Sequence, residues 1–290
     1  MNVDGVKLDG VKLDGPPGLL LIGHGSRSEL GVDQCRQLAR EVERLAPQLA
    51  VELGFIELAR PDLPSAIDAL VSRGCRNVIG VPLVLLGAGH LKLDGPAALS
   101  RGRLDHPGTT FAYARDLGVH PWVLEVAEDR IAETQDRLGD RFAVVLVGRG
   151  SSDPDANSDL YKVGRLLADS RGLGMVEPAF VSLAPPSVPE ALDRCLALGA
   201  RKVSVVPYFL FTGRLVERIA DQAGRWARDH PGTEVVVGPE LGPDERLARL
   251  ALERYAEAAA GQASMNCDCC IYRSPLPGYE ARARSHSGDL

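Results

Sequence analysis

Two kinds of segment are missing from this chain of 290 residues. No apolar run approaches the roughly 18 residues that suggest a membrane span, and the N-terminus lacks the basic start and apolar core of a secretory signal. An excess of positive charge is missing as well, since 33 Lys and Arg residues stand against 39 Asp and Glu, for a net charge of −6. We therefore expect a cytoplasmic protein with neither nucleic acid nor membrane as its partner.

Cysteine is scarce, and its six residues are unevenly placed. Three of them lie in periodic apolar segments, where small buried residues are expected: Cys35, Cys75 and Cys195. The other three crowd into four positions near the C-terminus: Cys267, Cys269 and Cys270. In a reducing compartment, such a cluster is more typical of metal binding than of disulfide formation.

What the chain does contain is one ordered set of motifs written twice. The pairs, in chain order, are GHGSR (23–27) and GRGSS (148–152), FIELARPDLPSAI (55–67) and FVSLAPPSVPEAL (180–192), GCRNVIGVP (74–82) and GARKVSVVP (199–207), and DHPGT at 105–109 and 229–233. The first three pairs are 125 residues apart and the last 124. Ordered matches at nearly constant spacing indicate a duplicated domain.

Each copy alternates short apolar runs with segments of helical periodicity. The runs expected to form strands are 19–22, 55–58, 78–86 and 111–114 in the first copy, and 143–147, 179–183, 203–211 and 234–237 in the second. Helices are expected around residues 35–45 and 63–71. This alternation predicts an α/β fold with two tandem doubly wound parallel sheets, in which ligands bind beyond the carboxyl ends of the strands. We expect domains at 17–138 and 139–260, a mobile arm at 1–16 and a loop-rich tail at 261–290.

The two copies differ where chemistry is expected. His24 of the first copy corresponds to Arg149 of the second, and Glu57 corresponds to Ser182. His90 corresponds to Arg214 when the 124-residue offset is used, or to Leu215 if the one-residue gap falls later in the alignment. Imidazole and carboxylate groups suit a transient divalent metal or the removal of a proton from a weakly acidic N–H, whereas arginines suit the recognition of carboxylates.

Other interpretations of these residues remain open. A single histidine at a strand end is more often structural than catalytic, Glu57 could cap a helix or pair with Arg60, and Arg149 could form a structural pair between domains. The GHGSRS segment lacks the glycine spacing of a dinucleotide fingerprint, and no Walker lysine follows it. Ser26 and Ser151 precede expected helices, whose N-termini can hold a carboxylate.

These motifs carry a resemblance to a known family. LIGHGSR, FIELARPDLPSAI and VPLVLLGAGHLKLDGP look like those of the sirohydrochlorin chelatases, the class II tetrapyrrole chelatases. LVGRGSSDPDAN and VPYFLFTGR resemble the degenerate half of the long members, so the resemblance covers roughly residues 17–245.

The resemblance implies a chelatase-like fold and insertion of a divalent metal, Co²⁺ or Fe²⁺, into the carboxylate-rich macrocycle sirohydrochlorin. Cobalt is favoured, toward cobalamin, and iron would give siroheme. His24 and His90 match the family's metal-binding and catalytic histidines, and Glu57 is expected to assist. The macrocycle is expected between the domains, with its carboxylates held by Ser26, Arg27, Arg149, Ser151 and Arg214.

For the tail, the resemblance implies an iron–sulfur centre at Cys267, Cys269 and Cys270. Thiolates suit such a cluster, although a cluster usually takes four ligands. A cluster bridging two chains, with Cys267 and Cys270 from each, would supply that number and imply a homodimer. Zinc, a redox thiol or an inert tail are the alternatives. Two further functions stay open for the whole chain: a metal or tetrapyrrole carrier without turnover, and a thiol-based metal or redox sensor.

Overall fold

The computed structural model describes residues 2–3, 6–7, 16–170, 172–265, 270–271, 277–278 and 281, with the side chains of residues 2–3, 6–7, 90–91 and 170 excepted. Most of the expected arm and tail, including Cys267 and Cys269, lies outside the described residues. Within the arm, strands β1 (Asn2–Val3) and β2 (Val6–Lys7) pair antiparallel. In the described part of the chain, the helices are all too short or too polar to cross a membrane.

The first half of the chain forms a four-stranded parallel sheet in the order β4-β3-β5-β6. Its elements are β3 (Pro17–Gly23), α1 (Glu29–Leu45), β4 (Ala50–Phe55), α2 (Leu63–Ser72), β5 (Asn77–Pro82), the π-helix η1 (His90–Asp94), α3 (Gly95–Asp105) and β6 (Thr110–Tyr113). Central strand β3 is covered on both faces, since Leu19, Leu20, Leu21 and Ile22 are at most 1% exposed. An unbroken apolar run of this kind is typical of a parallel strand between two helical layers.

The second half repeats this sheet with the equivalent order β8-β7-β9-β10. Its elements are β7 (Ala143–Gly148), α5 (Pro154–Ser170), β8 (Val176–Phe180), α6 (Val188–Ala197), β9 (Lys202–Pro207), α7 (Arg214–Asp229) and β10 (Glu234–Val237). The predicted pair of tandem parallel α/β domains is therefore confirmed. The strands predicted at 55–58 and 179–183 are placed too late in the chain, because β4 ends at Phe55 and β8 at Phe180. Residues 56–58 and 181–183 instead form loops beyond the strands.

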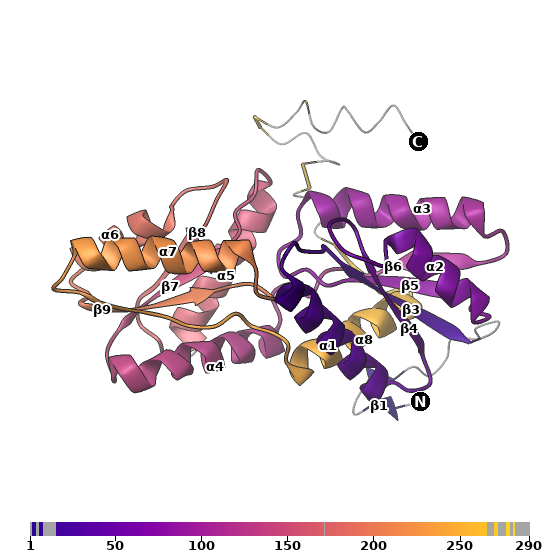
Figure 1. The fold of residues 1–290 in the computed structure, drawn as a ribbon, viewed down its shortest axis with the longest axis horizontal. Coiled ribbons are helices and arrows are strands. Elements are labelled where there is room, and N and C mark those ends of the chain that lie inside the picture. The colour runs from indigo at the N-terminus through magenta and orange to yellow at the C-terminus, as the bar shows by residue number, and fades with distance from the viewer. Residues whose placement is uncertain are drawn as a thin grey trace.

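The last helix of each half packs on the other half. Helix α4 (Pro121–Leu138) contacts β9, β10 and α5 of the second half, while α8 (Glu245–Ala259) contacts α1, β5 and β6 of the first. Figure 1 shows α4 beside the sheet of β7 and β9, and α8 beside α1 on the other side of the molecule. The domain ranges 17–138 and 139–260 stay a prediction for how the sequence divides. In space, each half exchanges its final helix with the other.

Two arginines stand at equivalent positions, 124 residues apart. Each binds the loop that precedes one of the exchanged helices. Arg130 of α4 donates from Nε and Nη2 to the carbonyl oxygens of Glu240 and Leu241, each at 3.0 Å. Arg254 of α8 donates to the carbonyl oxygens of Asp116 and Leu117 at 2.8 and 3.0 Å. The exchange is thus fastened in the same way at both crossings, and Arg254 is fully buried there.

Candidate active site

A cavity of about 890 Å³ lies between the two halves, beyond the carboxyl ends of both sheets. It is lined by the seven predicted catalytic and substrate-binding residues whose side chains are described: His24, Ser26, Arg27, Glu57, Arg149, Ser151 and Arg214. Side chains from beyond the ends of β3, β4, β7 and β9 therefore meet in one place, although His24 and Arg214 are 190 residues apart in the sequence. This is the position expected for a ligand in doubly wound sheets.

Gly25 brings the loops after β3 and β4 together. Its φ of +93° is unfavourable for other residues, and a Cβ there would lie only 1.7 Å from the carbonyl oxygen of Glu57. The Glu57 N–H donates to the carbonyl oxygen of His24 at 3.1 Å, which continues the strand pairing past the ends of both strands. The backbone thereby sets His24 and Glu57 side by side.

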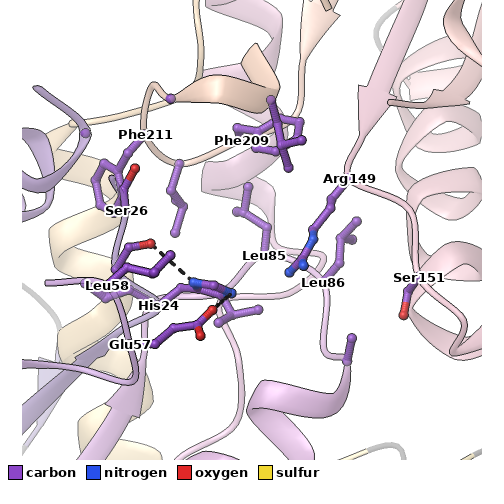
Figure 2. Close-up of a pocket in the computed structure, with 18 of the residues that line it drawn as sticks. His24, Ser26, Glu57, Leu58, Leu85, Leu86, Arg149, Ser151, Phe209 and Phe211 are labelled. Atoms are coloured by element: carbon purple, nitrogen blue, oxygen red, sulfur yellow. Dashed lines mark hydrogen bonds and ion pairs between the residues drawn. The ribbon is translucent and has the colours of Figure 1, made fainter. Parts of the chain in front are cut away.

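The His24 Nε2 atom lies 3.7 Å from Oε1 of Glu57, and the two side chains are 33% and 49% exposed. His24 Nδ1 is 3.2 Å from the Gly25 carbonyl oxygen, a contact that favours the proton on Nδ1 and a lone pair on Nε2. Two electron-donating atoms then face each other across a gap that suits a shared proton or cation. Figure 2 shows both side chains at the floor of the cavity.

Arg149 occupies the matching position after β7, and its side chain reaches into the cavity toward the side that holds His24 (Figure 2). Ser182, the counterpart of Glu57, donates from Oγ to the carbonyl oxygen of Arg149 at 3.1 Å. The Ser182 hydroxyl is therefore used in a backbone contact. Arg149 is the charged side chain that this position contributes to the cavity wall. Together with Arg27 and Arg214, it makes the rim of the cavity suitable for carboxylates.

The two predicted serines have a structural part in their loops. Ser26 Oγ accepts the Ser28 N–H at 3.0 Å, and Ser151 Oγ accepts the Asp153 N–H at 3.0 Å. Each forms a small turn just before a helix. Ser26 and Ser151 still line the cavity, so their predicted contact with a substrate carboxylate stays a prediction.

His90 begins the π-helix η1, but its side chain lies outside the described residues. Two residues on, Lys92 Nζ binds Asp153 Oδ2 at 2.7 Å and Asp155 Oδ2 at 2.9 Å in the second half. These side chains are 11%, 1% and 11% exposed, so the pairs are buried between the halves. Lys92 thus fixes the segment that carries His90 against the opposite wall, a role that the sequence patterns did not reveal.

Apolar side chains make up much of the remaining wall. Leu58, Leu85, Leu86, Phe209 and Phe211 surround the histidine and arginine sides of the cavity in Figure 2. Among the described side chains, no three His, Cys, Asp or Glu groups are arranged to hold a metal ion. The site therefore combines one imidazole–carboxylate pair, several arginines and an apolar surface.

Comparison with known proteins gives a consistent result. The CbiX family model matches residues 18–134 and again 143–258. The chain is 38% identical over 258 residues to the sirohydrochlorin cobaltochelatase of Priestia megaterium, covering 88% of this chain and 84% of that protein. It is 31% identical to the sirohydrochlorin ferrochelatase of the same organism, covering 80% and 86%.

A solved structure agrees with this relationship. The sirohydrochlorin chelatase SirB from Bacillus subtilis subspecies spizizenii, in complex with cobalt, superposes with a TM-score of 0.73 and 28% identity. The match covers 85% of this chain and 98% of SirB. Since the family model accounts for both copies of the duplicated unit, the chain belongs to the CbiX family.

Proposed function

We propose that this protein inserts a divalent metal ion, with cobalt favoured over iron, into sirohydrochlorin. The observation that carries the proposal is the His24–Glu57 pair facing Arg149 across the interdomain cavity. Support for the substrate comes from the names of relatives that match along nearly the whole chain, and the preference for cobalt rests on the 38% identical cobaltochelatase.

The reaction requires three things of the protein: a place for the metal, acceptors for two pyrrole protons, and a grip on the macrocycle. His24 Nε2 and Glu57 Oε1 are donors that can replace part of the metal's hydration shell. As the metal passes to the ring nitrogens, the lone pair of His24 becomes free to accept a pyrrole proton. Glu57 is 49% exposed, so a proton that it receives can leave to solvent.

The second half supplies the grip in this proposal. Arg149 and Arg214, with Arg27 from the first half, bind carboxylates at the edge of the macrocycle, while Ser26 and Ser151 offer additional polar contacts at the helix N-termini. His90 joins His24 as a metal ligand, carried by the segment that Lys92 fixes in place. A cytoplasmic location belongs to the same proposal.

The test is anaerobic insertion of Co²⁺ and Fe²⁺ into sirohydrochlorin, followed by absorbance. We expect the wild-type protein to turn over many times, with Co²⁺ the faster metal, and His24→Ala to lower the rate by about 100-fold or more. We expect the His24→Ala variant still to bind the metal-free macrocycle. A wild-type protein that binds the macrocycle but inserts neither metal above the spontaneous rate would favour a carrier instead.

For the tail, we extend the proposal to an iron–sulfur centre at the Cys267, Cys269 and Cys270 motif, bridging two chains of a homodimer through Cys267 and Cys270 of each. Of these residues the structure describes Cys270, a partly buried free thiol. The support is the cysteine spacing, because thiolates are the ligands of such clusters. Anaerobic purification followed by absorbance and iron analysis, with Cys267→Ser/Cys270→Ser as the control, tests it. Loss of iron and of the dimer in the control, with considerable insertion activity retained, is the expected result.

A further inference from the structure

Two leucines in the cavity wall have a left-handed backbone. Leu58 has a φ of 62° and Leu183 a φ of 67°, and in the part of the chain that the structure describes no other residue except glycine has a positive φ. They stand 125 residues apart and are therefore equivalent positions of the two halves. A side chain with this backbone is strained, so its retention in both copies calls for an explanation.

Each leucine is the middle residue of a three-residue turn. The Ala59 N–H donates to the Glu57 carbonyl oxygen at 2.8 Å, and the Ala184 N–H donates to the Ser182 carbonyl oxygen at 2.8 Å. With a positive φ at the centre, this is the rare and strained form of the γ-turn. The residue before each leucine bonds back to the loop of His24 or Arg149, so the turns are fixed beside those side chains.

The strain does not serve the core. Leu58 is 51% exposed and Leu183 is 71% exposed, yet both line the cavity between the halves. Figure 2 shows Leu58 next to His24 and Glu57. A strained turn that holds an apolar side chain in water gives the free protein no packing benefit. It does prepare an apolar contact for a ligand that enters the cavity.

The duplication sharpens this argument. At neighbouring positions the halves differ, with His24 against Arg149 and Glu57 against Ser182, whereas the leucine and its backbone conformation are the same in both. A flat ring system with polar groups at its edge is a ligand that would use different chemistry from the two walls and the same apolar contact from each.

From these observations we infer that Leu58 and Leu183 bind the apolar ring surface of the macrocycle, one from each half, and set its position relative to His24. This inference rests on the proposed function. The arginines hold the carboxylates at the edge, and the leucines select for a ring that has an apolar surface between them. Leu58 and Leu183 are thus specificity and positioning residues for the macrocycle and do not contribute to metal affinity.

The test uses Leu58→Gly, Leu183→Gly and the double variant of the full-length protein. Glycine adopts a positive φ without strain, so these substitutions remove the side chain and keep the turn. Anaerobic titration with metal-free sirohydrochlorin is expected to give a Kd raised about 10-fold for each single variant and more for the double, since a buried leucine contact is lost. The thermal unfolding midpoint is expected to stay or rise, and the Kd for Co²⁺ to stay unchanged.

Leu198→Ala serves as the matched control, because Leu198 is similarly exposed at 69% but has an ordinary φ of −82° and lies outside the cavity lining. Its macrocycle Kd is expected to equal that of wild type. Glycine variants that bind the macrocycle as wild type does, or that lose macrocycle and Co²⁺ binding together, would overturn the inference. If the glycine variants weaken macrocycle binding but the wild type inserts no metal, the leucine inference stands and the proposed catalysis fails. If the wild-type protein does not bind the macrocycle, both the leucine inference and the proposed function fail.

Discussion

The two halves of the molecule share a scaffold and differ in the chemistry of their strand ends. In the first half, Glu57 lies against His24 with 3.7 Å between Oε1 and Nε2. In the second, Ser182 turns its hydroxyl to the carbonyl oxygen of Arg149, and the arginine extends into the cavity. The same two loop positions thus yield an imidazole–carboxylate pair, the proposed site of proton and metal binding, on one side and a fixed cation on the other. A duplicated fold can divide a task between its copies without changing its backbone.

The most severe way to break this division is to give the first half the residue of the second. His24→Arg places a permanent cation at the proposed metal site, where it repels M²⁺ and offers no lone pair. We expect metal insertion to fall by about 1,000-fold, measured as the initial rate with saturating sirohydrochlorin and Co²⁺. The matched exchange in the second half, Arg149→His, should mainly raise the KM for the macrocycle, by about 10-fold. Equal losses of kcat in both variants would contradict the division of roles.

The two crossing links offer a comparison of stability. Arg254 is fully buried and holds the Asp116 and Leu117 carbonyl oxygens, whereas the Arg130 side chain is 20% exposed at the equivalent place. Arg254→Met leaves those carbonyl oxygens without their partner and removes one of the two arginines that bind Glu257, the other being Arg115. We expect it to lower the free energy of unfolding by about 3–5 kcal/mol. Arg130→Met should lower it by about 1–2 kcal/mol. Urea unfolding at neutral pH measures both. If the Arg130 variant proves the less stable, burial is not what separates the two crossings.

A smaller effect on stability is expected from Asp116, which lies in the loop before α4. The pKa of its carboxyl is raised from 3.8 to about 6, first by burial and then by the nearby Asp159, and against the lowering effect of Arg115, Arg254 and Lys92. The folded protein therefore holds this proton more tightly than the unfolded chain does, and the resulting stability, present below pH about 4, is lost as pH rises through about 6. Asp116→Asn should be about 1–3 kcal/mol more stable than wild type at pH 7.5, and the difference should shrink toward pH 5. Parallel pH profiles of unfolding free energy would argue against it.

Much of this architecture is predictable because the duplication is visible in the sequence. Repeated apolar runs predict the strands, and the loss of His24 and Glu57 from the second copy points to the cavity in which both are found. The exchange of α4 and α8 is not predictable in this way. An apolar helix face shows that the helix is covered, but it does not show which of two nearly identical sheets covers it.

Two parts of the site, the Lys92 ion pairs and the turn at Leu58, are not predicted by the sequence for other reasons. The ion pairs of Lys92 join residues 61 and 63 positions apart, and no local pattern relates them. The sequence predicts a strand at Leu58 because its apolar neighbours resemble one, whereas the Ala59 N–H donates to the Glu57 carbonyl oxygen and closes a turn there. The signal that was available is the leucine that both copies retain at positions 58 and 183, among residues that changed.

The exchanged helices also determine how the cavity can open. Because α4 and α8 each belong in space to the opposite half, the chain crosses between the halves twice, and reciprocal arginines clamp both crossings. With a single crossing, the two halves could rotate freely about one connecting segment of the chain. Two clamped crossings define a hinge axis, and they resist rotation about any other direction. A rotation about this axis would carry Arg149 and Leu183 toward or away from His24 and Leu58, and the buried ion pairs of Lys92 with Asp153 and Asp155 oppose it.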